Sequence, residues 1–91
     1  MGYDRTSLRE TDAPLDRPIE YLDVRELGPP EPLTVTLETL VDLDDETVLV
    51  QRNDRKPQFL YPRLQDRGYR FETVEGDSET VTVIWNEIDP S

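Results

Sequence analysis

The chain has 91 residues, enough for a single domain, and it carries 21 acidic against 10 basic side chains, a net charge of −11. Because a phosphate backbone or an anionic membrane binds to a basic surface, this balance argues against nucleic acid and membranes as partners. Cysteine and histidine are both absent, which excludes thiol chemistry, disulfides and the usual zinc ligands.

The basic residues are unusual in kind. Nine of the ten are arginine, and Lys56 is the only lysine. An acidic, lysine-poor chain is typical of a halophilic protein, because salt screens the repulsion between its carboxylates. We therefore expect a salt-adapted protein of a cytoplasmic compartment, the alternative being an ordinary acidic protein.

The first segment of the chain is too polar to build a core. Residues 1–17 hold few apolar side chains, widely spaced, and no apolar stretch of a signal peptide. They predict a disordered N-terminal arm, followed by one domain over residues 18–87 and a tail over residues 88–91.

A strand and a helix are expected next. Ile19, Tyr21 and Val24 mark a short strand, and the proline-rich run 27–32 follows it as a rigid loop. A helix from about Pro32 to Leu43 is then indicated by an apolar stripe with helical spacing at Leu33, Leu37, Leu40 and Val41.

The second half of the chain repeats this alternation and ends in a hairpin. Residues 47–51 are rich in β-branched side chains and predict a buried strand. A helix over residues 57–67 would turn Phe59, Leu60 and Leu64 inward, with Pro62 either kinking it or following a tight first turn. Gly68 suits the helix end, and residues 69–75 and 80–85 predict an antiparallel hairpin around residues 76–78.

This order predicts an α/β (α+β) two-layer sandwich of βαβαββ order. The first two strands should be parallel, since a right-handed crossover joins them. We expect a mixed four-stranded sheet with two helices on one face, and the opposite face open to solvent or to a partner.

Two motifs resemble those of the TusA/SirA-like sulfur-carrier family. Residues 22–32, with Asp23 and the prolines Pro29, Pro30 and Pro32, are similar to that family's Leu-Asp, Gly-Leu and Cys-Pro-x-Pro opening motif. Residues 61–62 and 68–69 resemble its second-helix proline and the Gly-His after it. The resemblance covers about residues 19–86 and implies the βαβαββ fold.

One departure limits what the resemblance implies about function. Pro29 stands where the family has its sulfur-bearing cysteine, and persulfide carriage needs a thiolate. The Pro-Pro-x-Pro variant resembles an uncharacterised prokaryotic branch catalogued as a domain of unknown function. Members of that branch occur alone or beside hemerythrin-like domains, an association that points to redox or nitrogen metabolism.

The best candidate site lies where the first two strands end. Ligands of open α/β sheets bind at such an edge, and the chain places a group of mostly basic residues there: Arg25, Arg52, Asn53, Asp54, Arg55 and Lys56. We expect this edge to bind a small anion or an acidic patch of a partner. The alternative is that its bases pair with neighbouring acids such as Glu26, Glu31 and Asp54.

Two further groups have a functional and a structural interpretation. Exposed aromatic side chains would mark a partner or homodimer surface, whereas buried ones would fill the core; the candidates are Tyr21, Tyr69, Phe71 and Trp85. The acidic run with Asp42, Asp44 and Glu46 could hold a hard cation, but it lacks the glycine of a calcium loop, and a solvated turn is the favoured interpretation.

These observations favour a non-catalytic binding or partner-docking domain with no cofactor, no metal and no catalytic residue. Its partner would be an unknown protein or a small anion, and the chain would be a monomer or a weak homodimer. The alternative is a small enzyme or accessory factor that acts on an anionic metabolite, with carboxylates such as Asp23 or Asp54 as the base.

Overall fold

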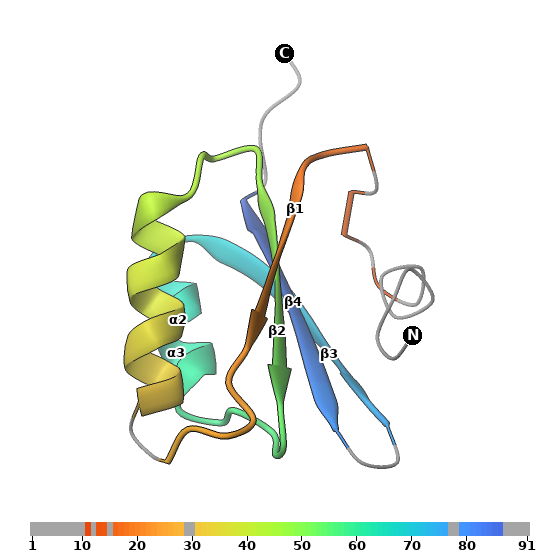
Figure 1. Ribbon diagram of the computed structural model, residues 1–91. Helices are drawn as coiled ribbons and strands as arrows, with labels where there is room; N and C mark the ends of the chain where they lie inside the picture. The colour runs from red at the N-terminus through yellow and green to blue at the C-terminus, as the bar shows by residue number, and fades with distance from the viewer. Residues whose placement is uncertain (1–10, 12, 15, 29–30, 77–78, 87–91) are drawn as a thin grey trace.

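The observed elements follow the predicted order and confirm the fold class. The computed structural model describes residues 11, 13–14, 16–28, 31–76 and 79–86 (Figure 1). The elements are β1 (Ile19–Asp23), α2 (Glu31–Asp42), β2 (Val48–Asn53), α3 (Leu60–Asp66), β3 (Tyr69–Glu75) and β4 (Thr80–Asn86). The prolines Pro29 and Pro30 and the predicted tail over 88–91 lie outside the described residues.

The four strands form one mixed sheet in the order β1-β2-β4-β3. β1 and β2 run parallel, as the crossover rule predicts, with Ile19 beside Val48 and Asp23 beside Arg52. β4 is antiparallel to both β2 and β3. Because β2 and β4 are the central strands, they carry the most deeply buried side chains, and the ends of β1 and β2 meet at one edge.

Both helices pack on the same face of the sheet, as expected (Figure 1). The cluster on this face is aliphatic and consists of Leu40, Leu49, Leu60, Leu64 and Ile84. Leu33 and Leu37 add the rest of the α2 stripe, and Leu43, just after the helix, packs against the same cluster. Val41, which the sequence placed on that stripe, is 69% exposed, because the helix centres its buried face on Thr36 and Leu40.

The opposite sheet face is buried, so the expectation of an open face was wrong. The side chains of this face form a second buried cluster together with Ala13; its members are Ala13, Val48, Val50, Val81, Val83 and Trp85. Ala13 belongs to the segment before β1, which lies on this side of the sheet (Figure 1). Nearby, Nη1 of Arg17 donates a 2.7 Å hydrogen bond to the carbonyl oxygen of Asn86. The predicted boundary of the arm at residue 17 stays a prediction.

Three of the four aromatic candidates serve the core. Trp85 is buried on one face of the sheet, and Tyr69 and Phe71 pack against the aliphatic cluster on the other. Phe71 also stacks on Tyr61, with ring centroids 4.9 Å apart. Tyr21 is 44% exposed, so it is the member of the set that still fits a surface role.

The second helix is shorter than predicted and begins after a turn. Leu60 N–H donates to the carbonyl of Pro57 at 3.0 Å, and α3 then starts at Leu60 with Pro62 in its first turn, where a missing N–H leaves no bond unmade. Phe59 lies in the turn and is 82% exposed, so its predicted inward orientation was wrong.

No helix within the described ranges is long and apolar enough to cross a membrane.

Candidate functional site

The residues predicted to form one basic edge are divided between the two faces of the sheet. Successive side chains of a strand point to opposite faces, so Arg52 and Asn53 at the end of β2 are separated. Arg25 and Arg52 join an ion-pair cluster, whereas Asn53, Arg55 and Lys56 line a cleft on the helical side.

The ion-pair cluster contains Asp23, Arg25, Arg52 and Glu79. Arg25 donates to Asp23 through Nε at 3.0 Å and through Nη2 at 2.9 Å, and these hydrogen bonds are the main cause that lowers the pKa of the Asp23 carboxyl below 3.8. Glu79 lies between Nη1 of Arg25, at 3.6 Å, and Nε of Arg52. This cluster therefore ties together residues at the ends of β1, β2 and β4.

Asn53 organises the turn that follows β2. It is only 4% exposed, and its Oδ1 accepts hydrogen bonds from the backbone N–H of Asp54 at 2.7 Å and of Arg55 at 3.3 Å. Asparagine favours turns because its side chain can satisfy the following backbone in this way. Arg55 Nε also pairs with Asp54 Oδ1 at 3.3 Å.

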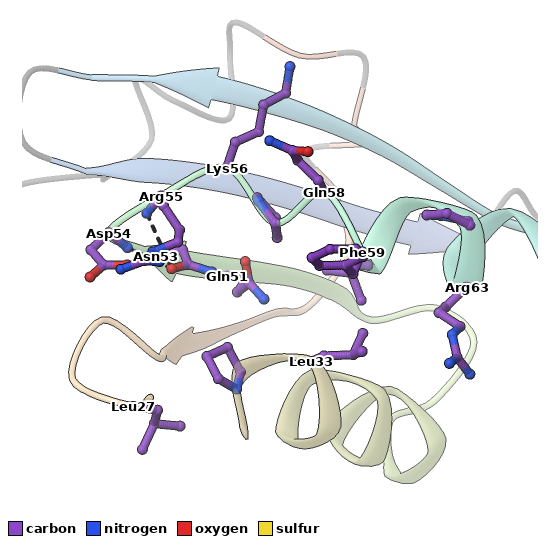
Figure 2. Close-up of a pocket in the computed structure, with 14 residues that line it drawn as sticks. Leu27, Leu33, Gln51, Asn53, Asp54, Arg55, Lys56, Gln58, Phe59 and Arg63 are labelled. Atoms are coloured by element: carbon purple, nitrogen blue, oxygen red, sulfur yellow. Dashed lines mark hydrogen bonds and ion pairs between the residues drawn. The ribbon is translucent and has the colours of Figure 1, made fainter. Parts of the chain in front are cut away.

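A cleft of about 620 Å³ opens between the start of α2, the end of β2 and the segment that leads into α3 (Figure 2). Small-molecule sites generally have volumes of this order. The apolar part of its lining consists of Leu27, Pro32, Leu33, Pro57, Phe59, Leu60 and Pro62. The sequence pointed to the β2 end of this cleft, but Phe59 and Arg63 were not among the predicted site residues.

The cleft is basic although the chain is acidic. It is lined by three cations, Arg55, Lys56 and Arg63, and by one acid, Asp54. Within the described part of the chain, Lys56 and Arg63 form no ion pair. In Figure 2, Arg63 extends from α3 toward α2, and Lys56 extends from the loop away from α2. Arg63 is thus available to an external anion across the cleft, and Lys56 is available once its flexible side chain turns back toward it.

A buried glutamine, Gln51, also lines the cleft. Gln51 has no exposed surface, and its Nε2 donates a 2.7 Å hydrogen bond to Oγ1 of Thr36 on α2. Its Oε1 accepts no hydrogen bond from any described residue. Figure 2 shows this oxygen turned away from α2, toward the segment that leads into α3.

Residues 21–86 match the family model of an uncharacterised conserved protein, DUF2249. That stretch runs from β1 to the end of β4 and includes every residue that lines the cleft. The chain belongs to the DUF2249 family. The expectation of a domain of unknown function is thereby confirmed. No curated protein and no solved structure matches this DUF2249 chain.

Two described residues of the proline-rich run of this DUF2249 chain line the cleft. Leu27 and Pro32, which flank the undescribed pair Pro29 and Pro30, both line it. Asp23, the other motif residue, lies in the ion-pair cluster instead. Across the described ranges, no three carboxylates gather closely enough to hold a metal ion, and this includes the turn with Asp42, Asp44 and Glu46.

Proposed function

We propose that this DUF2249 chain is a non-catalytic binding domain whose cleft holds a ligand with an apolar body and an anionic group. The ligand is either a small anion or an acidic segment of a partner protein. The observation that carries the proposal is the concentration of three cations on an apolar cleft in a chain of net charge −11.

The two kinds of lining residue suit two parts of one ligand. Apolar walls such as Leu33 and Phe59 favour an apolar body, because contact removes their surface from water. Lys56 and Arg63 can donate charge-assisted hydrogen bonds, which are stronger than neutral ones. Asn53 supports this side of the cleft by holding the backbone of the turn that carries Arg55 and Lys56.

The ion-pair cluster has a different role in this proposal. Arg25 and Arg52 already contact the carboxylates of Asp23 and Glu79, so they fix the strand ends rather than meet the ligand. This is the neighbour-pairing alternative to the original hypothesis. It fits these two residues and also Arg55, which pairs with Asp54.

The proposal extends to the setting of the protein. The βαβαββ order supports a relationship with the sulfur-carrier fold, and the absence of cysteine anywhere in the chain leaves that relationship without sulfur transfer. We further propose a halophilic, cytoplasmic protein that acts as a monomer or weak homodimer.

The second candidate is a small enzyme that acts on an anionic metabolite of redox or nitrogen metabolism. The concave shape of the cleft, with Asp54 on its lining, is the observation that favours it. Against it, Asp23, whose pKa is displaced by its hydrogen bonds with Arg25, lies outside the cleft. Its pKa is lowered, which makes it a weaker base than an ordinary aspartate.

The test compares benzoate with its neutral isostere benzamide in titrations followed by amide NMR signals, at low salt and in about 1 M KCl, where the Debye length is about 3 Å. We expect benzoate to shift the signals of residues 53–56 and 58 and to bind about tenfold more tightly than benzamide at low salt. Arg63→Gln combined with Lys56→Gln should remove this preference.

Arg67→Gln is the matched control, because Arg67 is an exposed arginine one turn after Arg63 and does not line the cleft. It should leave the preference for benzoate intact. Equal affinity for the two probes, or no shift of residues 53–56 and 58 with either, would overturn the proposal. New ligand signals that grow with time would instead identify turnover and favour the enzyme.

A further inference from the structure

Resting on the proposed function, we propose that the side-chain carbonyl of Gln51 selects the ligand. The ligand is a small molecule that donates an N–H or O–H hydrogen bond to Oε1 of Gln51, while an anionic group at its other end meets the cations of the cleft. Gln51 is then a specificity-determining residue at the base of the site.

The first argument is that Gln51 Oε1 is an exception among its neighbours. On the same sheet face, the hydroxyls of Tyr61, Thr73 and Thr82 are hydrogen-bonded to one another, with Thr73 Oγ1 3.1 Å from Thr82 Oγ1. Gln51 is paired on its nitrogen side with Thr36, but its oxygen is unpaired among the described residues. Buried polar groups are nearly always paired, so this acceptor calls for an explanation.

The second argument is that an apolar side chain would serve the fold better at this position. Gln51 lies on a central strand, between β1 and β4, and shares its sheet face with the aliphatic residue Leu49. A buried acceptor without a donor is destabilising, and isosteric apolar replacement of both hydrogen-bonding partners is nearly neutral. Such departures from good packing are expected where a protein binds something.

The third argument concerns the size of the ligand. Gln51 is fully buried and lines the cleft together with Leu33 and Phe59 (Figure 2). A flat protein surface cannot reach it, whereas a single slender donor group can. The terminal torsion of glutamine is broad, so the amide can tilt slightly to present Oε1 to a donor in the cleft while Nε2 stays near Thr36.

Three probes of nearly the same shape test the proposal in the intact chain. Each is a benzoate with a different group opposite the carboxylate: 4-hydroxybenzoate offers a donor, 4-methylbenzoate offers none, and 4-formylbenzoate offers only an acceptor. We expect 4-hydroxybenzoate to bind about tenfold more tightly than the other two and to shift the side-chain amide signals of Gln51.

The variant Gln51→Met should bind all three probes with equal affinity, because a thioether is at most a weak acceptor. Gln65→Met, an exposed glutamine outside the cleft, should retain the preference for the hydroxyl. If Gln51→Met does not fold, the double variant Gln51→Met/Thr36→Val removes both partners of the hydrogen bond and keeps the volume of the site.

The outcomes separate this inference from the proposed function. Equal affinity of the three probes for the unaltered chain, a preference for 4-formylbenzoate, or a preference for the hydroxyl that survives Gln51→Met would overturn the role of Gln51 and leave the binding domain standing. If none of the probes shifts the cleft signals, the proposed function fails together with the inference.

Discussion

Asp23 shows how a single residue of the strand-end cluster should respond to acid. Hydrogen bonds from Arg25 lower its pKa in the folded chain below 3.8. A lowered pKa means that the charged carboxylate stabilises the folded state at every pH above the ordinary pKa of an aspartate. That stabilisation is lost as the pH falls through the lowered pKa.

We therefore predict that Arg25→Gln moves the Asp23 titration back toward 3.8, as measured by the carboxyl carbon signal in NMR. Because the Asp23 side chain is 42% exposed, Asp23→Asn should reduce the free energy of unfolding at pH 7 by at most about 1 kcal/mol. It should also remove part of the loss of stability below pH 4.

Arg55→Gln is the control for this prediction. Arg55 pairs with Asp54 and not with Asp23, so its loss should leave the Asp23 titration in place. A midpoint for Asp23 at or above 3.8 in the unaltered chain would contradict the hydrogen-bonded geometry of the cluster.

The end of α3 provides a prediction at the scale of an element. Gly68 has φ +81°, a left-handed conformation that costs a residue with a Cβ about 1–2 kcal/mol. A methyl group built there would meet no atom within 4 Å, so the cost comes from the backbone alone. Gly68→Ala should lower the free energy of unfolding by about 1–2 kcal/mol in urea denaturation, and Gly68→Asn by less.

Gly28→Ala is the matched substitution, because Gly28 also has open space around its Cβ position and lacks a positive φ. It should be neutral or stabilise the chain by up to about 1 kcal/mol, through the lower entropy of the unfolded state. Equal effects of the two substitutions would show that the left-handed cap does not limit stability.

The elements themselves were largely predictable, because their signals are local. The stripe Leu33, Leu37 and Leu40, the β-branched run in β2 and the glycine after α3 all depend on neighbours in sequence. The predicted inward orientation of Phe59 was wrong for a local reason as well. The turn closed by Pro57 makes the helix begin at Leu60 instead of residue 57, and this leaves Phe59 outside the periodic stripe.

The site was only partly predictable, because its composition depends on the order of the strands. Arg52 meets Glu79 only because β4 inserts beside β2. The same insertion makes β2 central and buries Gln51, which a sequence pattern identifies as no more than a strand residue. The buried second face is also non-local, since it depends on Ala13 from before β1.

At the scale of the whole molecule, the dominant electrostatic quantity is the net charge of −11. Self-repulsion of that size opposes a compact state, and it weakens as the Debye length falls from about 10 Å at 0.1 M salt to about 3 Å at 1 M. We predict that the free energy of unfolding rises as KCl increases over this range, measured by urea denaturation with far-UV circular dichroism.

The acidic turn after α2 allows this prediction to be separated from general effects of salt on folding. Asp44, Asp45 and Glu46 are adjacent and exposed, so neutralising all three as Asn, Asn and Gln should stabilise the chain in dilute buffer by about 1 kcal/mol, taking about 0.3 kcal/mol per relieved like-charge contact. In 1 M KCl the gain should vanish, because salt already screens those contacts. Sucrose, which favours burial without screening charge, should stabilise both forms equally. If the unaltered chain is as stable in dilute buffer as in concentrated KCl, its acidic surface is not an adaptation to salt.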